Sequence, residues 1–423
     1  MDKRNILVFP CGSEIGLDIY NCVKYSTYFN LIGASSIEDH GRFVYDDYIG
    51  GVPFVSDPSV ITFLQNIVKE RRIDAIYPTM DSVICYLKKH ESVIGCKVVS
   101  SPYEVTELCL SKSRTYKRLE GVVSVPLSYN MGDDISYPVF IKPDIGYGAI
   151  GTKLVHNYME LKSEIIDGVD KLILEYLPGE EYTVDCFTSR EGCLKFASAR
   201  QRHRVKSGIS VNTSFVENQA EFWAIANKIN AEIDFRGAWF FQVKRRENGE
   251  LCLLEVASRF GGSSLLSKAR GVNLPLLSLF DAFDYDVDIV INDYSVELDR
   301  SMGCRYKLEI SYDTVYVDFD DCLVLDRSVV NEELVSFLYR CLNKNIKIVL
   351  LTKHDGDLQE NLKRYRLYQL FDEIIHLNAQ DDKWKYIKGR SSIFIDDSHV
   401  ERREVKQRLN IPVFSPEMID VLV

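Results

Sequence analysis

A lysine and three glycines in the central part of the chain have the types and spacing of a phosphate-binding element. Lys142 ends an apolar run and is followed by Gly146, Gly148 and Gly151. A lysine can meet phosphate oxygens, and glycines let backbone amides approach them closely. Because the apolar pattern resumes at 153–155, this loop joins two strands, whereas Walker-type phosphate loops open a helix. Considered alone, this pattern favours a purely structural hairpin, and the functional hypothesis is a flexible flap over a triphosphate.

Two acidic residues follow in the stretch LEYLPGEEYTVD, which covers 174–185. Glu175 ends an apolar run, where a turn would expose backbone donors and acceptors to the edge of an adenine ring. Glu181 follows closely, and its carboxylate can accept hydrogen bonds from ribose hydroxyl groups. A solvated hairpin is the favoured reading when this stretch is considered alone.

A carboxylate and an arginine near the end of a later apolar run extend this chemistry. If the side chain of Glu255 points inward it needs a partner, and Mg2+ is the natural one because it prefers oxygen ligands and phosphate. Arg259 follows on the same stretch and can neutralise charge that develops on a transferred phosphoryl group. Together with the preceding stretches, these residues indicate a nucleotide site.

Polar residues also follow three apolar runs in the C-terminal part of the chain. They are Asp318 and Asp320, then Thr352, then Asp396 and Asp397. Ligands bind at the carboxyl ends of parallel strands, and clustered carboxylates need a cation or raised pKa values to coexist. Acidic turns that cap helices are the alternative, because Asp is common there. The three strand ends together favour a second site, to which Lys383 or Lys385 would bring a positive charge.

The periodicity of apolar residues predicts the elements that position these side chains. Up to Pro102 strands and helices alternate, which indicates a parallel sheet. The expected strands there are 6–10, 74–77 and 97–99, and the expected helices end at Tyr25 and cover 60–72 and 82–91. A helix is expected at 108–119. The central strands are expected at 138–142, 153–155, 172–176, 182–188, 194–200, 237–245 and 251–256, with a helix at 220–229. In the C-terminal part, strands 314–318, 347–351 and 392–395 alternate with helices 331–344, 357–365 and 400–409.

These patterns predict a multidomain protein of the α/β and α+β classes. Residues 1–108 are expected to form an α/β domain, and 109–295 an α+β domain whose strands are antiparallel in character. A linker is expected at 296–312. Residues 313–423 are expected to form a doubly wound α/β domain.

The composition limits the kinds of partner. Lys and Arg total 51 and Asp and Glu total 62, which gives a net charge of −11. This balance disfavours a general nucleic-acid or membrane-surface binder, because phosphate groups repel it. The 11 cysteines are scattered without a C-x-x-C pair, and no apolar stretch approaches the roughly 20 residues of a membrane span. We expect a cytoplasmic protein.

The order of the central stretches resembles the ATP-grasp superfamily, most closely its carbamoyl-phosphate-synthase-like branch. The matching segments are FIKPDIGYGAIG, LEYLPGEEYTVD, ARQRHRVKSG and FQVKRRENGELCLLEVASRFGG, and the resemblance runs from about Asn5 to about Tyr294. It makes 1–108 a pre-ATP-grasp domain and 109–295 the ATP-grasp domain. The implied chemistry is attack of a substrate carboxylate on the γ-phosphate of ATP, after which an amine or ammonia displaces phosphate from the acyl phosphate.

The resemblance also implies roles for individual residues. The implied ATP ligands are Lys112, Lys142, Gly146, Gly148, Gly151, Glu175, Leu177 and Glu181. Gln242 and Glu255 match positions that ligate Mg2+, with Mn2+ as an alternative. Arg259 matches the arginine that stabilises the acyl phosphate, and Arg200 and Arg202 match a pair that faces the carboxylate substrate. One departure is Ala257, where many members carry an Asn, because alanine cannot ligate a metal ion.

From about Asp313 to Val423 the chain resembles the haloacid dehalogenase superfamily of phosphatases. The resemblance makes Asp318 the nucleophile and Asp320 the general acid and base. It makes Thr352 the phosphate-binding hydroxyl and Lys383 the charge-neutralising lysine, with Lys385 as the rival. The implied metal ligands are Asp318, Asp320, Asp396 and Asp397. The segment between Leu323 and Thr352 is too short for a sizeable cap domain, so we expect an open site.

These observations lead to two hypotheses. The first is a bifunctional enzyme, an ATP-dependent carboxylate–amine ligase combined with a magnesium-dependent phosphomonoester hydrolase. Its partners would be a small-molecule carboxylate, an amine and a phosphorylated small molecule, without nucleic acid or membrane, and a homodimer is a fair default. The second is a phosphatase whose ATP-grasp part binds nucleotide only as a regulator, for which Ala257 is the best evidence.

Overall fold

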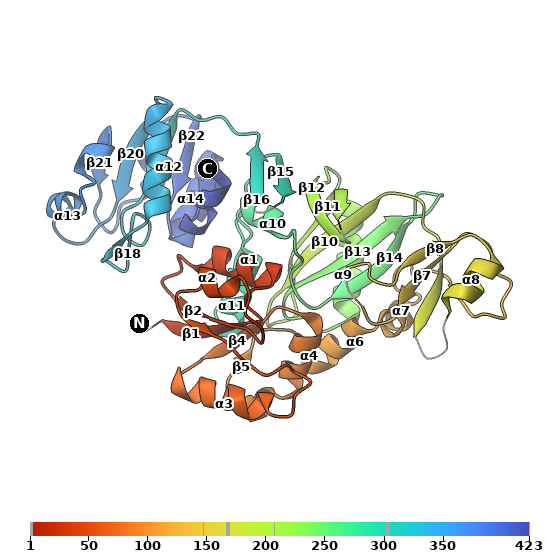
Figure 1. Cartoon of the computed structure of the whole chain (residues 1–423). Helices are drawn as coiled ribbons and strands as arrows, with labels where there is room; N and C mark the ends of the chain where they lie inside the picture. The colour runs from red at the N-terminus through yellow and green to blue at the C-terminus, as the bar shows by residue number, and fades with distance from the viewer. Residues whose placement is uncertain (1–2, 147, 166–169, 207, 302–303, 423) are drawn as a thin grey trace.

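The computed structural model describes residues 3–146, 148–165, 170–206, 208–301 and 304–422. Figure 1 shows a four-stranded sheet with α8 (Tyr158–Glu164) at one end of the molecule and a C-terminal unit at the other. The N-terminal unit and a seven-stranded sheet lie between them. Within the described ranges, no helix is long and apolar enough to cross a membrane.

The N-terminal unit contains the predicted parallel sheet, with the strand order β3-β2-β1-β4-β5. Its strands are β1 (Arg4–Phe9), β2 (Phe29–Ala34), β3 (Tyr48–Ile49), β4 (Ala75–Pro78) and β5 (Lys97–Val98). Its helices are α1 (Glu14–Val23), α2 (Gly41–Val44), α3 (Val60–Glu70), α4 (Asp81–Lys89) and α5 (Glu91–Ile94). Alternate residues of β1 face opposite sides: Ile6 and Val8 pack with α1, and Leu7 packs with α3 and α4. The prediction of a parallel sheet covered on both faces is confirmed.

The predicted helix at 108–119 is wrong in one respect, because two helices stand there. They are α6 (Tyr103–Leu110) and α7 (Lys112–Leu119). Ser111 between them has extended backbone angles, and its side chain accepts a hydrogen bond from the backbone N–H of Arg114. A serine in this role ends one helix and begins another, which apolar periodicity does not reveal.

The four-stranded sheet is antiparallel where its strands pair, and has the order β6-β9-β7-β8. Its strands are β6 (Ser128–Tyr129), β7 (Val139–Pro143), β8 (Lys153–Val155) and β9 (Lys171–Glu175). The pairing of β7 with β8 shows that the glycine loop joins two neighbouring antiparallel strands, as the sequence predicts.

The seven-stranded sheet is antiparallel and has the order β14-β13-β10-β11-β12-β15-β16. Its strands are β10 (Glu181–Thr188), β11 (Leu194–Lys206), β12 (Ile209–Phe215), β13 (Gly237–Arg245), β14 (Leu251–Ala257), β15 (Val296–Arg300) and β16 (Cys304–Leu308). The helices beside it are α9 (Ala220–Glu232), α10 (Leu265–Ala269) and α11 (Leu274–Ala282). The predicted linker at 296–312 is therefore wrong over most of its length, because β15 pairs with β12 and β16 pairs with β15 at the edge of this sheet.

The C-terminal unit has a five-stranded parallel sheet with the order β21-β20-β17-β22-β23. Its strands are β17 (Thr314–Val317), β20 (Lys347–Thr352), β21 (Glu373–His376), β22 (Ser392–Ile395) and β23 (Val413–Phe414), beside a hairpin of β18 (Val324–Leu325) and β19 (Val329–Val330). The helices are α12 (Glu332–Asn343), α13 (Leu358–Arg364), α14 (His399–Leu409) and α15 (Ile419–Leu422), with short 3-10 turns at η1 (Tyr368–Leu370), η2 (Lys383–Lys385) and η3 (Pro416–Met418). Val315 and Val317 pack with α12, whereas Tyr316 packs with α14, so both faces of the sheet are covered.

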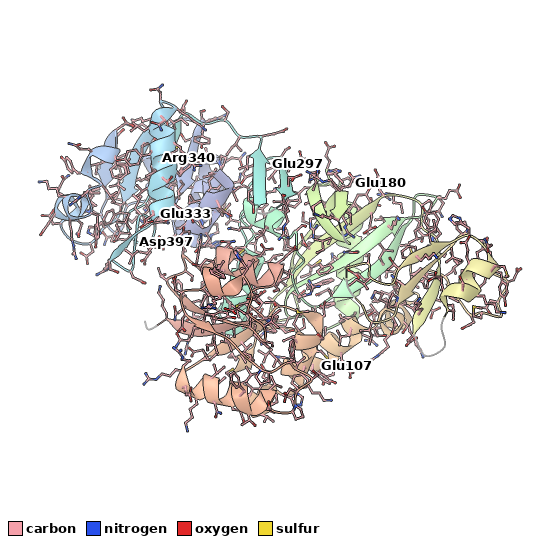
Figure 2. The ribbon with its side chains drawn as sticks, viewed as in Figure 1. Glu107, Glu180, Glu297, Glu333, Arg340 and Asp397 are labelled. Atoms are coloured by element: carbon pink, nitrogen blue, oxygen red, sulfur yellow. The ribbon has the colours of Figure 1, made fainter. Side chains whose placement is uncertain are left out.

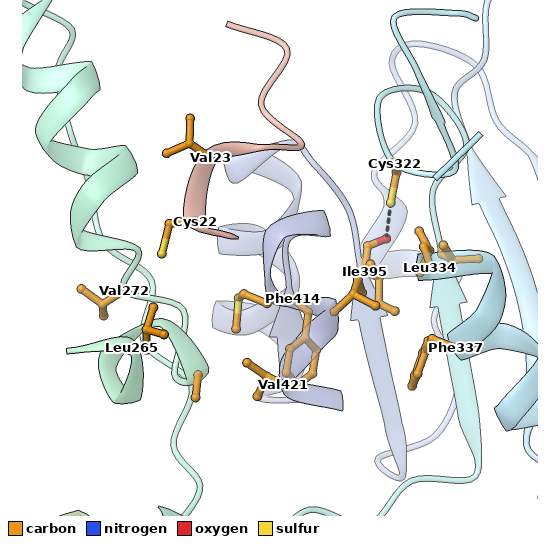
Figure 3. Close-up of a cluster of buried hydrophobic side chains, with 14 of the residues drawn as sticks. Cys22, Val23, Leu265, Val272, Cys322, Leu334, Phe337, Ile395, Phe414 and Val421 are labelled. Atoms are coloured by element: carbon orange, nitrogen blue, oxygen red, sulfur yellow. Dashed lines mark hydrogen bonds between the residues drawn. The ribbon is translucent and has the colours of Figure 1, made fainter. Parts of the chain in front are cut away.

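One continuous apolar core joins the C-terminal unit to the rest of the molecule. Figure 3 shows side chains of α1, α10 and α12 in this core, together with Phe414 and Val421 near the end of the chain. Because the same core includes β1 of the N-terminal unit and β17 of the C-terminal unit, the two units are packed together and do not hang on a flexible tether.

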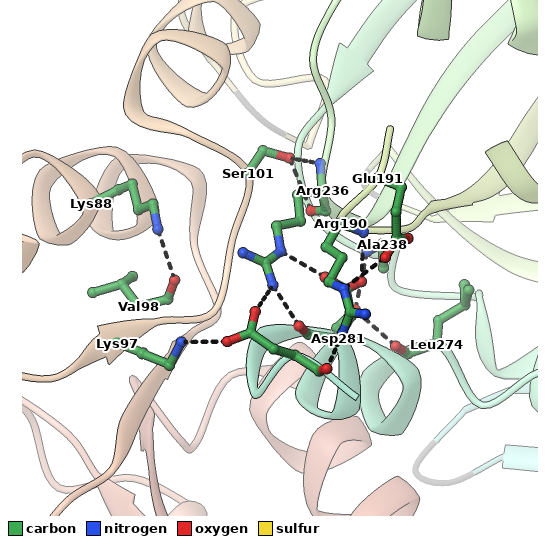
Figure 4. A network of polar contacts seen from close by, with 12 residues as sticks. Lys88, Lys97, Val98, Ser101, Arg190, Glu191, Arg236, Ala238, Leu274 and Asp281 are labelled. Carbon is green, nitrogen blue, oxygen red and sulfur yellow. Dashed lines mark hydrogen bonds and ion pairs between the residues drawn. The ribbon is translucent and has the colours of Figure 1, made fainter. Parts of the chain in front are cut away.

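Buried polar contacts fix the relative position of these units. Lys268 on α10 has a side chain that is 2% exposed, and its Nζ donates to Asp420 Oδ1 at 2.9 Å and to the backbone oxygen of Asn21 at 3.1 Å. The buried side-chain amide of Asn292 exchanges two hydrogen bonds with the backbone of Val413. Figure 4 shows a third set of contacts, in which Arg236 binds Ser101 of the N-terminal unit and Asp281 of α11.

Loss of the Lys268 side chain is expected to destabilise the protein by about 2 kcal/mol, because Asp420 and a backbone oxygen lose a charged donor in a buried site. Urea unfolding of Lys268→Ala followed by circular dichroism measures the change. Lys24→Ala is the matched control: its ion pair with Glu333 also joins the two units, but both side chains are partly exposed. We expect a cost below about 1 kcal/mol for Lys24→Ala. Equal costs for the two variants would contradict this account of the interface.

Candidate functional site

A cavity of about 240 Å³ lies between the four-stranded and the seven-stranded sheets. The glycine loop, the end of β7 and the end of β9 form one wall, and β10, β11, β13 and β14 form the other. The predicted site residues in its lining are Lys112, Lys142, Gly146, Gly148, Glu175, Leu177, Glu181, Arg202, Gln242 and Glu255. Residues separated by more than a hundred positions in the chain therefore meet around one space.

Lys142 is the buried cation of this cavity. Its Nζ donates to the backbone oxygen of Leu254 at 2.8 Å and lies 5.4 Å from the ring centroid of Tyr116. Burial lowers the pKa of Lys142 to about 8, and the nearby carboxylate of Glu255 only partly offsets that effect. The amine is therefore mostly charged at neutral pH, and it shares the cavity lining with the cationic side chains of Lys112, Arg202 and Lys244.

Lys112 begins α7 and lies beside the first residues of the glycine loop. Its Nζ donates to the backbone oxygens of Asp144 and Gly146 at 3.2 and 3.3 Å. The buried carboxylate of Asp144 accepts from Ser111 Oγ at 2.6 Å and from the backbone N–H of Ser113 at 2.7 Å, which ties the start of α7 to the loop. Sequence reasoning missed Asp144, although an acidic residue next to the Lys-Pro pair was the available signal.

The glycine loop needs its glycines for backbone shape. Gly148 and Gly151 have φ values of +62° and +76°, a region that other residues rarely adopt. Gly151 does not line the cavity, so its contribution is to the turn. At Gly208, in the turn after β11, an added Cβ would lie 2.4 Å from the backbone carbon of Gly148. The turn between β11 and β12 therefore packs directly on the glycine loop, a contact that the sequence analysis missed.

Gln242 and Glu255 are direct cross-strand neighbours on β13 and β14. Opposite residues of an antiparallel pair have Cβ atoms about 5 Å apart, so their oxygens can reach one ion. An amide oxygen and a carboxylate are hard donors of the kind that Mg2+ prefers, and their chemistry fits that ion. Ala257, the position of the expected Asn, is buried opposite Phe240 and offers no donor.

Glu181 and Arg202 form an ion pair within the cavity wall. Arg202 also donates from Nη1 to Gln242 Oε1 at 3.2 Å and from Nη2 to the backbone oxygen of Gly208 at 2.5 Å. Arg202 thus links the expected ribose ligand, an expected metal ligand and the turn that packs on the glycine loop.

Arg200 does not line this cavity, in contrast to its predicted role beside the carboxylate substrate. Its side chain is 3% exposed and binds Asp185 through Nε at 2.9 Å and Nη2 at 3.4 Å. Ser264 Oγ donates to the same carboxylate at 2.6 Å. Arg200 and Arg202 share a face of β11, but only Arg200 lies beside the buried carboxylate of β10, and that pairing determines its position.

Two further predicted residues have partners that the sequence did not indicate. The carboxylate of Glu175 pairs with Arg246 and accepts from the backbone N–H of Leu127 at 2.9 Å, so it braces the wall of the cavity. Arg259 lines a second cavity of about 70 Å³ and pairs with Asp81 of the N-terminal unit. Only Glu175 of these two borders the larger cavity.

A second cluster lies at the carboxyl ends of β17, β20 and β22. Val317 pairs with Leu350 of β20 and Ile395 of β22, so the residues that follow these strands meet at one edge. Side-chain oxygens of Asp318, Asp396 and Asp397 lie within 4.8 Å of one another. The Thr352 side chain is 0% exposed, and its hydroxyl has no hydrogen-bond partner among the described residues. Figure 2 labels Asp397 in the C-terminal unit and Glu180, the residue before β10, in a different part of the fold, so the two clusters are separate.

Lys383 lies inside this cluster and Lys385 does not. Lys383 Nζ is 2.6 Å from Asp396 Oδ2 and 2.9 Å from Asp318 Oδ1. The Lys385 side chain is 56% exposed and pairs with Asp382. Burial and the neighbouring Asp318 raise the pKa of Asp396 to about 7, against the opposing effect of Lys383. A divalent cation would relieve this repulsion, so the carboxylate set fits Mg2+.

Asp320 is held slightly apart from the three carboxylates. Its Oδ2 lies 2.8 Å from Nδ1 of His354, whose Nε2 lies 3.1 Å from the side-chain amide of Asn361. The sequence analysis did not single out His354 or Asn361, because neither residue belongs to a strand-end pattern.

Comparison with known families supports the ATP-grasp resemblance. Residues 168–299 match a family model described as ATP-grasp in the biosynthetic pathway with Ter operon. This match ends before the C-terminal unit, so the haloacid dehalogenase resemblance stays a prediction, as does the carbamoyl-phosphate-synthase-like branch.

Solved structures of several enzymes share the fold. The biotin carboxylase domain of Hydrogenobacter thermophilus 2-oxoglutarate carboxylase, crystallised with MgADP, ADP and bicarbonate, has a TM-score of 0.60 at 17% identity, over 70% of this chain and 74% of that one. N5-carboxyaminoimidazole synthetase from Staphylococcus aureus, complexed with ADP, has a TM-score of 0.60 at 15% identity, over 71% and 83%. L-amino acid ligase from Bacillus licheniformis has a TM-score of 0.56 at 14% identity, over 70% and 79%. The chain therefore has a biotin-carboxylase-like ATP-grasp fold over about 70% of its length.

Proposed function

We propose that this protein is an ATP-dependent ligase that joins a carboxylate to an amine or to ammonia through an acyl phosphate. The cavity between the two sheets is the observation that supports the proposal most directly. Lys112, Lys142 and the glycine loop border it as cationic and amide donors, and Gln242 and Glu255 border it as oxygen donors. Such opposed walls suit a triphosphate that carries a metal ion.

The remaining lining suits the other parts of ATP. Apolar side chains of Phe140, Leu174 and Leu254 offer surfaces for a purine ring. Gln242 and Glu255 would hold Mg2+, which supplies charge neutralisation to phosphate oxygens when bound. The name of the L-amino acid ligase that shares the fold is consistent with a carboxylate and an amine as the substrate classes.

The proposed reaction needs two bond exchanges. A carboxylate oxygen attacks the γ-phosphorus, and the bond from that phosphorus to the bridging oxygen breaks as ADP leaves. An amine nitrogen then attacks the acyl carbon, phosphate leaves with the electrons of the broken C–O bond, and the amine loses a proton to solvent. The protein's share is to position the reactants and neutralise charge, for which Lys142 and Arg259 are the candidate cations.

ADP release is expected to require one matching carboxylate and amine. The test follows ADP from ATP and Mg2+ over a panel of carboxylates crossed with amines, with the full-length protein. We expect Glu255→Ala to lower the rate by about 100-fold, because phosphate charge then lacks its metal ligand. Asp318→Asn, in the other cluster, is the control and should keep the rate. Absence of ADP from every pair would contradict the ligase proposal.

The affinity for ADP is expected to fall as the pH rises through about 8. The pKa of Lys142 is lowered to about 8, so the amine loses its positive charge over this range while the diphosphate stays anionic. Calorimetric titration in the absence of divalent cations should show the Kd rising about tenfold between pH 7 and pH 9.5. Lys142→Arg, which stays charged, should show a much flatter profile. A wild-type Kd that is constant up to pH 9.5 would contradict the role of Lys142.

The C-terminal cluster supports a second activity, hydrolysis of a phosphomonoester. The specific observation is that Lys383 contacts both Asp318 and Asp396 at the ends of adjacent parallel strands, beside the hydroxyl of Thr352. Asp318 would attack the phosphorus while Asp320 gives a proton to the leaving oxygen. Water, deprotonated by Asp320, would then attack the aspartyl phosphate and restore Asp318. Asp318, Asp396 and Asp397 would hold Mg2+, which lowers the repulsion between the attacking carboxylate and the phosphate.

Hydrolysis of p-nitrophenyl phosphate in the presence of Mg2+ tests this activity. Asp318→Asn should lose roughly 1,000-fold or more, because the nucleophile is gone. Lys383→Ala should lose about 100-fold, since the buried carboxylates lose their compensating charge. The exposed lysine variant Lys385→Ala is the matched control and should retain activity. Equal losses for the two lysine variants would contradict the site. Hydrolysis that ATP alters without ADP release would instead favour a phosphatase regulated by nucleotide.

A further inference from the structure

Arg259 is held in one orientation by contacts on several sides. Its Nε donates to Asp81 Oδ1 at 2.8 Å and its Nη2 to Asp81 Oδ2 at 2.9 Å, a two-point contact. Its Nη1 donates to the backbone oxygen of Phe260 at 3.1 Å, and its Cζ lies 5.4 Å from the ring centroid of Phe240. The side chain keeps 21% of its surface exposed and borders the smaller cavity.

Asp81 reaches this arginine from a different part of the chain. Asp81 is the first residue of α4 and lies three residues after Pro78, the last residue of β4. Arg259 lies two residues after Ala257, the last residue of β14. The two residues are 178 positions apart. A carboxylate in the first turn of a helix interacts favourably with the helix dipole, and the planar guanidinium of an arginine can bind a carboxylate through two hydrogen bonds.

Arg259 borders the smaller cavity and lies four residues after Glu255, which borders the larger one. Leu254 and Glu255 border the larger cavity, and Ser258, Arg259 and Phe260 border the smaller one, so a single stretch of chain lines both. The smaller cavity also includes Pro78, at the end of a parallel strand where α/β sheets bind ligands. An arginine at this junction can meet charge that develops on a group transferred out of the larger cavity.

We propose that Asp81 is a positioning residue for the ligase reaction, which fixes the guanidinium of Arg259 toward the phosphoryl group during transfer. This inference depends on the proposed ligase function. An arginine side chain loses conformational entropy when it is fixed, which costs free energy. Because Asp81 fixes it before substrates bind, that cost does not fall on the transition state.

The pair is not needed merely to join the N-terminal unit to the sheet. Lys97 of the N-terminal unit pairs with Asp284 after α11, and Ser101 accepts from Arg236, in the network of Figure 4. Lys97→Ala therefore removes an ion pair across the same boundary without touching Arg259, and serves as the matched control.

The test measures the affinity of the full-length protein for Mg·ADP, with and without aluminium fluoride, by calorimetry. Aluminium fluoride beside ADP mimics a phosphoryl group in transfer. We expect aluminium fluoride to raise the affinity of the wild type for Mg·ADP. In Asp81→Asn this gain in affinity should be about tenfold smaller. Binding of Mg·ADP alone should stay unchanged, as should both affinities in Lys97→Ala. In an Arg259→Lys background, Asp81→Asn should have no further effect, and Asp81→Glu should recover part of the gain in the wild-type background.

The outcomes separate this inference from the function on which it depends. If the wild type gains affinity from aluminium fluoride but Asp81→Asn keeps the whole gain, the positioning role is overturned and the ligase proposal stands. An effect of Asp81→Asn that persists in the Arg259→Lys background would also overturn it, because Asp81 would then act through another group. If aluminium fluoride gives the wild type no gain, the ligase proposal fails and this inference fails with it. Should Asp81→Asn not fold, Asp81→Ala takes its place.

Discussion

The pairing of β13 with β14 determines where the oxygen donors of the nucleotide cavity lie. Gln242 stands opposite Glu255, and on its other side Gln242 stands opposite Thr183 of β10. A shift of β14 by one residue against β13 would turn Glu255 to the opposite face of the sheet from Gln242. The apolar residues of these strands pack with α9 and make such a shift costly, since Trp239, Phe241 and Val243 alternate into one core. The geometry of the cavity is thus a consequence of packing on the far side of the sheet.

The pKa of the buried lysine is shifted in opposite directions in the two candidate sites. In the nucleotide cavity, burial lowers the pKa of Lys142, and the nearby carboxylate of Glu255 offsets only part of that effect. That leaves an amine whose positive charge is not already neutralised, which is suited to an anionic ligand. In the C-terminal cluster, Lys383 is desolvated between two carboxylates and its pKa is raised. There the negative groups are in excess, and the space is suited to a cation and then to a phosphate bound through it.

The contacts among α1, α10 and α15 make the chain a single packed body. Lys268 touches backbone of α1 and the side chain of Asp420, and the apolar core continues from β1 to β17. The strand β15 carries Arg300, which lies close to Asp18 of α1. This strand therefore belongs to the same packed body as the C-terminal sheet.

Much of the architecture could be predicted from the sequence, because it depends on local periodicity and on strand-end chemistry. The strands 153–155, 237–245 and 392–395 have the predicted bounds, and the glycine loop joins two antiparallel strands as expected. Other elements were missed or misread, including β2, β12 and the two strands in the predicted linker. Those strands carry polar residues that interrupt the apolar pattern, and β15 is held by β12, which lies more than 80 positions earlier in the chain.

The sequence by itself determined which residue types were available at each strand end, and so the kind of chemistry at both sites. Only the tertiary structure decided which of them face a cavity. Arg200 pairs with Asp185 and does not border the nucleotide cavity. Lys383 contacts the C-terminal carboxylates, whereas Lys385 is exposed. Asp81 binds Arg259, which is 178 positions away in the chain. Periodicity reports the environment of a residue within one element, whereas an ion pair in a cavity depends on the meeting of two elements. That information is absent from any local pattern.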